Sequence, residues 1–509
     1  MTGLLIRDCM LWDGAPGAVY CEEGRIARIY RGSDPDLPAG AQVIDASGGS
    51  LHPGLVDTHC HPFDYGWLKR SVDLRGTTNI TGGRMRLSSG LRKAAPGEWV
   101  VGMGWDQEAF PGRNMPSRLD IDDISPSNPV VLSRICGHIG LLNSVAITQL
   151  GLEPTENPEY DRGRSGELTG IVKETALTEA IRMVPKVPER LASDLQGVEV
   201  EGARLGLAGL HTIISPEGFV EELTALAELQ ADGRLALRHR VYIPPESLGY
   251  MKEKRLVEKL NGHNVRVNGV KIFTDGSLGG RTAALREPYT DDPKNSGLLR
   301  MSDGELDDLV DLVDSMGFQA IVHAIGDRAV EQSVRSLSRV SGANNPRRHR
   351  IEHAGLVPRD LRGKMAKHGI AAAVQPCFVT SDTWAIDRVG DERIKDLYPT
   401  KSMLSEGIVV SGGSDCPVES LSPILGIWAA MTRGGVVPEE SLSLDQSLAL
   451  YTSNAAANGL DEIDLKEGSP ANFTLFDSDI QGMHPALFRK VGILATVVEG
   501  APVHSYGPG

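Results

Sequence analysis

A regular alternation of short apolar runs with amphipathic helical patterns is the feature that most constrains the fold. In the helical pattern at residues 303–317, Leu306, Val310 and Val313 recur on one face. Strands that alternate with helices predict an α/β fold built from βα units around a parallel sheet. Residues 50–61 add an eighth strand, and eight parallel strands close a (β/α)8 TIM barrel. The other seven predicted strands are 210–214, 237–244, 267–276, 318–326, 348–355, 370–376 and 408–415.

The two ends of the chain carry a different pattern, in which β-rich runs alternate with glycine-containing turns. Because isolated two-stranded pieces are rarely stable, we expect residues 1–50 and 456–509 to build one composite β-sandwich. The barrel domain is then predicted over 51–455. Within it, the stretch from about 65 to 207 is too long for one crossover helix and contains a helical run from 168 to about 183. We predict that this stretch is an inserted lobe over the barrel mouth.

Composition and charge exclude several classes of protein. Lysine plus arginine is 52 and aspartate plus glutamate is 67, which gives a net charge of −15. A chain of this charge without a basic run is repelled by nucleic acid and by anionic membrane surfaces, so neither is an expected partner. The six cysteines are scattered without a CxxC pair, as is typical of reduced thiols. No signal peptide or membrane-spanning run is visible, and we expect a cytoplasmic protein.

Metal-ligand side chains stand at the ends of four predicted barrel strands. His59 and His61 end the first strand, His323 and His353 lie at the ends of the fifth and sixth, and Asp415 ends the eighth. Side chains at the carboxyl ends of barrel strands converge, and residues two apart on a strand share a face. A single histidine is more often structural than a ligand. Four at equivalent strand ends, with an aspartate, predict a site for zinc or another divalent metal.

Lys271 lies in the middle of the fourth predicted strand, between Val270 and Ile272. Burying an ammonium group there is unfavourable unless it is paired or neutralised. One interpretation is a salt bridge with Asp275 at the strand rim. The other is a lysine carboxylated by CO2, whose anionic carbamate would bridge two metal ions.

These residues occur within motifs that resemble a known family. The run GLVDTHCH at 54–61 is followed in order by Lys271, His323, His353 and Asp415. With the segments GWDQEAF, GHIGLLNS, GELTGIVKE, VKIFTDGSLGGRTAAL, HAIGD, RIEHAG and GGSDCPVES, it resembles the amidohydrolase superfamily. The branch resembled is the amidohydrolase-3 branch, which includes N-substituted formamide deformylase-like enzymes. The resemblance extends over nearly the whole chain.

The resemblance implies a metal-dependent hydrolase that acts on carbon–nitrogen bonds other than peptide bonds. His59 and His61 would hold the more buried ion, and Lys271, as an N6-carboxylated lysine, would bridge to a second ion. The family includes members with one metal and members with two. A metal-activated hydroxide would attack the carbonyl carbon, and Asp415 would contact the metal and act as proton shuttle. The implied metal residues are His59, His61, Lys271, His323, His353 and Asp415.

The implied substrate is a small-molecule amide, formamide or cyclic amide, and the implied assembly is a homodimer. Two alternatives remain open. One is a non-catalytic scaffold or regulator with the same fold, although such relatives usually lose ligands. The other is a deaminase-type relative, which typically carries a glutamate in the segment after the fifth strand, where this chain has Asp327.

Four further residues are candidates for binding the substrate. Trp105, Asp106 and His138 lie in the predicted lobe, where they would shape the pocket and exclude water or, alternatively, pack within the lobe. Arg281 ends a glycine-rich loop after the fourth strand. It would hold a polar substrate group or only brace the loop.

Overall fold

The computed structural model describes residues 3–32, 35, 40–152, 156–342, 344–459, 461 and 465–506. The chain divides into two compact units. The first, the barrel unit, combines residues 1–65 with 195–509, and the second, the insertion unit, is the continuous segment 66–194. Helices α1 (Pro62–Arg70) and α5 (Pro188–Arg204) carry the chain across the two boundaries. No helix in the described part of the chain is long and apolar enough to span a membrane.

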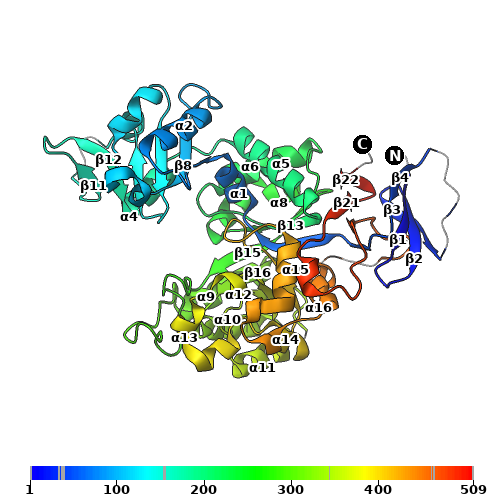
Figure 1. Ribbon diagram of the computed structural model, residues 1–509. Coiled ribbons are helices and arrows are strands. Elements are labelled where there is room, and N and C mark those ends of the chain that lie inside the picture. The colour runs from blue at the N-terminus through cyan, green and yellow to red at the C-terminus, as the bar shows by residue number, and fades with distance from the viewer. Residues whose placement is uncertain are drawn as a thin grey trace. The chain divides into compact units, whose positions relative to one another are not determined.

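The barrel unit is built on eight parallel strands that follow one another in sequence order, as expected for a TIM barrel. Three of them, β13, β15 and β16, are labelled in Figure 1. Each predicted barrel strand overlaps an observed one, although residues 51–53 of the first predicted strand belong to a different sheet. Within the strands nearly every side chain is buried, as in a sheet covered on both faces. The strands are β6 (Leu55–Cys60), β13 (Leu207–Ile213), β14 (Arg238–Ile243), β15 (Val265–Phe273), β16 (Gln319–Ala324), β17 (Arg350–His353), β18 (Ala371–Val374) and β19 (Val410–Gly412).

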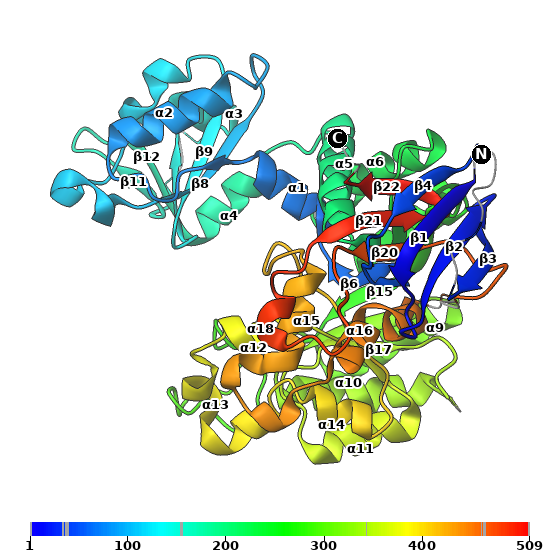
Figure 2. The same ribbon diagram turned by 45° about the vertical axis from the view of Figure 1, so that its right-hand side comes forward.

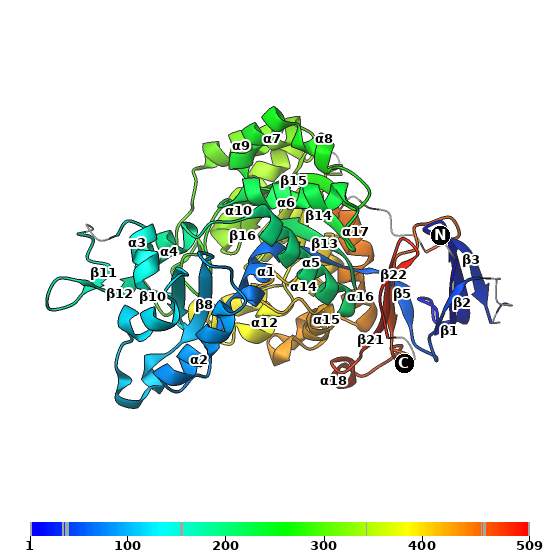
Figure 3. The same cartoon turned by 90° about the horizontal axis from the view of Figure 1, so that it is seen from above.

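Amphipathic helices surround this sheet, and α6, α7, α8 and α9 lie outside β13–β16 (Figure 3). Helix α9 shows why the sequence folds this way: Ser302 and Glu305 form a capping box, and Leu306, Val310 and Val313 are buried on one face. The helices after α5 are α6 (Phe219–Ala231), α7 (Leu248–Lys254), α8 (Leu256–Leu260), α9 (Asp303–Ser315), α10 (Asp327–Val340), α11 (Arg359–His368), α12 (Phe378–Ser381), α13 (Ala385–Arg393), α14 (Thr400–Ser405), α15 (Pro423–Thr432), α16 (Leu444–Tyr451), α17 (Ser453–Gly459) and α18 (Pro485–Phe488).

The barrel closes where the end of β6 meets the segment that follows β19. The Asp415 N–H donates to the His59 carbonyl at 2.7 Å, and the His61 N–H donates to the Cys416 carbonyl at 2.9 Å. Gly413 lies at the point of closest approach, because a Cβ there would lie 2.6 Å from the backbone nitrogen of His59. The sequence therefore needs glycine at this position for the first and last strands to meet.

The two ends of the chain form the composite β-sandwich (Figure 2). One sheet has the order β3-β2-β1-β4 and the other β22-β21-β20-β5. A single apolar cluster joins them, with Ile6 and Val19 from the first sheet and Phe473 and Val497 from the second. The strands are β1 (Leu4–Met10), β2 (Pro16–Glu22), β3 (Arg25–Arg31), β4 (Gln42–Asp45), β5 (Leu51–Pro53), β20 (Phe473–Phe476), β21 (Ile493–Val498) and β22 (Ala501–Ser505).

The insertion unit is a six-stranded sheet with the order β11-β12-β10-β9-β8-β7. The expected helical run from 168 was wrong over its first part, since 168–173 is strand β12, paired with β10 through Val172 and Ile171. Helix begins only at Glu174. The elements are β7 (Val72–Asp73), α2 (Ile80–Leu91), β8 (Val100–Trp105), β9 (Val130–Arg134), β10 (Ile139–Leu142), α3 (Ser144–Gln149), β11 (Tyr160–Arg162), β12 (Leu168–Lys173) and α4 (Glu174–Arg182).

Substituting Gly413 tests the closure of the barrel. Because the new Cβ of Gly413→Ala would overlap the His59 backbone, we expect a loss of about 1–3 kcal/mol and a lower thermal unfolding temperature. Gly363→Ala is the matched control, since Gly363 is within α11 and its Cβ would meet nothing within 4 Å. That control should be neutral or slightly stabilising. Equal unfolding temperatures for both variants in calorimetry would contradict the close approach at Gly413.

Candidate metal centre

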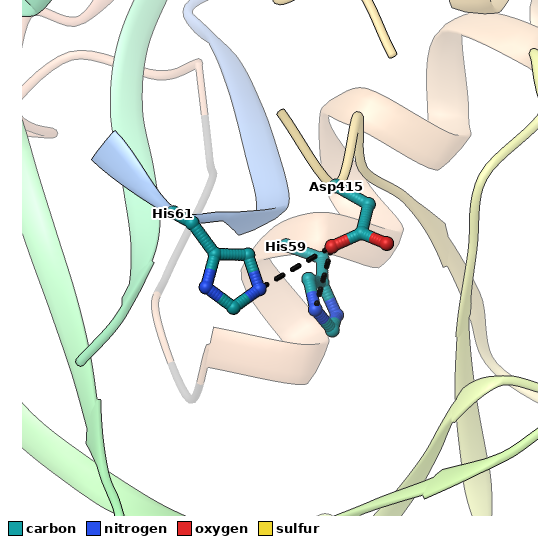
Figure 4. A group of neighbouring side chains, drawn as sticks. All are labelled: His59, His61 and Asp415. Carbon is teal, nitrogen blue, oxygen red and sulfur yellow. Dashed lines mark ion pairs between the residues drawn. The ribbon is translucent and has the colours of Figure 1, made fainter. Parts of the chain in front are cut away.

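The end of β6 and the segment after β19 bring His59, His61 and Asp415 together (Figure 4). The Asp415 Oδ1 atom lies 3.4 Å from His59 Nε2 and 3.3 Å from His61 Nε2. One ligand atom from each of the three side chains lies within 4.8 Å of the other two. This spacing allows one cation to contact all three side chains.

Lys271 joins this group from β15. Its side chain is buried, and Nζ donates to His59 Nε2 at 3.0 Å. The structure does not pair Lys271 with Asp275, as one interpretation of the sequence had it. The Asp275 carboxylate instead accepts backbone N–H groups from Ala284, Ile325 and Gly326 at 2.9–3.1 Å, so it anchors the loops after β15 and β16.

His323 and His353 continue the cluster of imidazoles across β16 and β17. The His353 ring centroid lies 4.5 Å from that of His323 and 4.9 Å from that of His59. The His59 and His61 centroids are 5.5 Å apart. The structure therefore brings all six residues expected at the metal site into one group of neighbouring side chains.

Three of the four histidines are held by an acceptor on one ring nitrogen. His59 Nδ1 donates to the Glu352 carboxylate, and His353 Nδ1 donates to Gln375 Oε1 at 2.7 Å. His323 Nε2 faces the Gly276 carbonyl at 3.1 Å. Such contacts fix the tautomer and leave the other nitrogen with a lone pair, which is how metal-ligating histidines are oriented. His323 Nδ1 is buried and has no hydrogen-bond partner among the described residues, as is expected of a metal-ligand atom.

Sequence reasoning missed Glu352, although it precedes His353 in the quoted segment RIEHAG. Its carboxylate lies between His59 and Arg350, whose Nε donates to Glu352 Oε1 at 2.5 Å. The side chains of Glu352 and Arg350 are fully buried, and Arg350 also donates to the Thr58 carbonyl at 3.0 Å. The sequence did hold a signal for Glu352, because charged residues at 350 and 352 lie inside a strand that was expected to be buried.

Burial and neighbouring charges set the protonation states of the cluster. Burial and the Lys271 charge lower the pKa of His59 to about 4, so its imidazole is neutral at pH 7. Burial lowers the pKa of Lys271 to about 8. For Asp415, burial opposes ionisation, but the attraction of His59 and a hydrogen bond from His61 hold its pKa well below the usual range. Glu352 is ionised for the same kind of reason, since Arg350 and His59 outweigh its burial and keep its pKa low.

The backbone at two of these positions is strained. His353 and Asp415 have φ angles of 68° and 55°, and Ala354 has 44°. Residues other than glycine rarely adopt this left-handed region, and each costs about 1–3 kcal/mol unless the surroundings compensate. Such strain gathers at functional sites, and here it occurs at two of the six clustered residues.

The four residues expected to bind substrate make other contacts. Arg281 pairs with Asp291 at 2.9 Å, so it braces its own loop. Trp105 lies in the core of the insertion unit, where its indole N–H donates to the Leu132 carbonyl. Also within that unit, Asp106 accepts from Arg134 at 2.8 Å and His138 Nδ1 lies 3.0 Å from Glu174.

A parallel barrel whose strand ends gather imidazoles, a lysine and a carboxylate has the architecture of a metal-dependent hydrolase. The family model described as "Amidohydrolase family" matches residues 42–504, and the chain belongs to this family.

Relatives and solved structures agree with this assignment. YtcJ of Bacillus subtilis is 31% identical over 510 residues, 96% of each chain. The N-substituted formamide deformylase of Arthrobacter pascens is 25% identical over 95% of this chain and 94% of its own. The crystal structure of an uncharacterized metal-dependent hydrolase from Pyrococcus furiosus covers 95% of this chain and 99% of its own, with 31% identity and a TM-score of 0.82. Family and neighbours support hydrolase activity on carbon–nitrogen bonds.

Glu352→Gln tests whether this carboxylate orients His59. Breaking a buried ion pair costs about 3–5 kcal/mol, and losing the partner of a metal-bound histidine typically lowers metal affinity about 10- to 100-fold. We therefore expect a lower unfolding temperature together with weaker metal retention in a chelator titration.

Glu199→Gln is the matched control for this variant. Glu199 forms another buried contact with a histidine, His239, at 3.1 Å, and it lies outside the cluster. We expect this variant to lower stability and leave metal affinity unchanged. Equal loss of metal from both variants would contradict the role of Glu352.

Proposed function

We propose that this chain is a metal-dependent amidohydrolase that hydrolyses the C–N bond of a small amide, formamide or cyclic amide. The observation that carries the proposal is the convergence of His59 Nε2, His61 Nε2 and Asp415 Oδ1 at the carboxyl ends of the barrel strands. The positions and the donor types of these ligands suit a divalent cation of the zinc type.

The four histidines of the cluster form two pairs, and each pair would hold one ion in a two-ion arrangement. We assign His59 and His61 to the more buried ion, and His323 and His353 to the second. Lys271 lies next to His59 in a fully buried position, where an ammonium beside metal ions would be repelled. We propose that its amine is carboxylated, because a carbamate replaces the positive charge with two anionic oxygen ligands.

A bound divalent cation would lower the pKa of water and polarise the substrate carbonyl. Asp415 is the residue placed to move the proton. It is ionised at neutral pH, so it can accept a proton from the attacking water. The protonated Asp415 then donates to the leaving nitrogen. His59 stays neutral because burial and the Lys271 charge lower its pKa, and its tautomer is fixed because Glu352 accepts from its Nδ1.

Two other functions have less support. A non-catalytic scaffold would not need a complete ligand set, and here all six positions are filled. A deaminase-type relative would need an acid after β16. Asp327 stands there, but its Oδ1 accepts the Arg286 backbone N–H at 2.8 Å at the start of α10. That contact gives Asp327 a structural role.

Substrate selection belongs, in this proposal, to the loops after the barrel strands and to the insertion unit, with Trp105, Asp106, His138 and Arg281 as positions to test. A cytoplasmic homodimer is the proposed state of the protein, on the grounds of charge, scattered cysteines and fold.

Metal content separates the one-ion and two-ion arrangements. Elemental mass spectrometry of the purified protein should give about two equivalents of a zinc-type metal if Lys271 is a bridging carbamate. Protein exchanged into 13C-bicarbonate should then show a carbamate carbon signal by NMR, which Lys271→Ala removes. One equivalent and no carbamate signal would contradict the bridge. No metal after supply of metal and bicarbonate would contradict the hydrolase.

Asp415→Asn separates proton transfer from metal binding. We expect this variant to retain metal, because the histidines remain, and to lose turnover by about 100-fold or more. Asp327→Asn is the matched control and should keep near-wild-type turnover, since an amide oxygen still accepts the Arg286 N–H. Hydrolysis of N-formyl and N-acyl amides is the assay. Full activity in Asp415→Asn would contradict the role of Asp415 as proton shuttle. A large loss of turnover in Asp327→Asn would favour the deaminase-type alternative.

A further inference from the structure

The loop after β15, residues 274–302, and the segment after β18, residues 375–399, contact one another and contain five arginines. Four of them are neutralised or used as structural donors. Arg281 and Arg388 share Asp291, Arg286 pairs with Glu331 and Asp360, and Arg393 donates to the carbonyls of Glu287 and Pro288. The fifth arginine, Arg300, is different.

Arg300 is fixed at the rim of the barrel by its backbone. Its N–H donates to the carbonyl of Thr274, the residue that follows β15, at 2.8 Å. Its side chain is exposed, and within the described part of the chain its guanidinium makes neither an ion pair nor a side-chain hydrogen bond. The contact it does make is with an aromatic ring: Cζ stands over Phe273, 5.8 Å from the ring centroid.

Phe273 contacts both the Arg300 guanidinium and residues of the candidate metal centre. Its ring centroid lies 4.9 Å from Lys271 Nζ and 5.2 Å from the centroid of His323. Phe273 follows Lys271 by two residues on β15, so the two side chains share a face of the strand. The ring therefore contacts both the candidate metal centre and the guanidinium.

We infer that Arg300 binds an anionic group of the substrate, so that the substrate is an amide that carries a carboxylate beyond an apolar spacer. This inference rests on the proposed function. A guanidinium that lies over a ring without a hydrogen-bonded side-chain partner keeps its N–H groups available, and these match the two oxygens of a carboxylate. Phe273 supplies the apolar surface along which the spacer lies between the scissile carbonyl and the charge.

Matched substrates test this inference on the metal-loaded protein. N-formyl-γ-aminobutyrate and N-formylbutylamine present the same formamide with and without a carboxylate. We expect wild-type kcat/KM to favour the carboxylate by on the order of tenfold or more, mostly through KM. In Arg300→Gln the preference should disappear. In Arg300→Glu it should turn toward the cationic amide N-formylputrescine.

Arg339→Gln is the matched control, because Arg339 on α10 pairs with Asp307 and Asp311 on α9, outside the metal cluster. It should keep the wild-type preference. Equal kcat/KM for the two formamides in wild type, or an unchanged preference in Arg300→Gln, overturns the inference.

Binding measurements separate this inference from the proposed function. Calorimetric titration of both formamides into metal-loaded Asp415→Asn, with and without Arg300→Gln, reports the charge preference without turnover. If neither compound is hydrolysed and the carboxylate still binds more tightly only when Arg300 is present, the proposed activity fails and the anion site stands. If turnover occurs and binding does not depend on charge, the hydrolase stands and the anion site fails.

Discussion

The candidate site depends on the hydrogen bonds that close the barrel between its first and last strands. His59 and Asp415 belong to segments more than 350 residues apart, and the backbone bond between them places both side chains at one point. The Asp57 carboxylate reinforces this junction by accepting the N–H groups of His59 and Ser414, both at 3.0 Å. The same contacts close the barrel and bring the ligand side chains together. The geometry of the metal cluster therefore depends on an intact barrel sheet.

A second set of contacts fixes the orientation of the imidazoles. Glu352, Gln375 and the Gly276 carbonyl each hold one histidine nitrogen, and all three lie on or just after barrel strands. Arg350 in turn holds Glu352 within the barrel interior. The barrel interior is therefore polar as well as packed, and the ion pair of Arg350 with Glu352 orients His59. Burying these charges is tolerated because each has a partner.

Much of the fold and the cluster was predictable because both depend on periodicity. Strand–helix alternation located all eight barrel strands. The convergence of the histidines and Asp415 could be predicted because these residues occupy equivalent positions at the ends of barrel strands. The supporting acceptors could not be found this way, since they come from packing between strands rather than from spacing. The interpretation of 168–173 as helix failed because pairing with β10 decides that segment. Arg300 belongs to no recognised motif, and it was set apart only because its guanidinium has no ion pair or side-chain hydrogen bond among the described residues.

The composite sandwich has a consequence for how the chain matures. Its apolar cluster needs Val19 from one end of the sequence and Phe473 from the other. Ribosomes add about 5–20 residues per second, so the N-terminal strands emerge on the order of tens of seconds before the strands that cover them. During that interval their apolar face stays open to water or to a chaperone. Completion of the sandwich thus becomes a late event of biosynthesis that follows synthesis of the whole barrel.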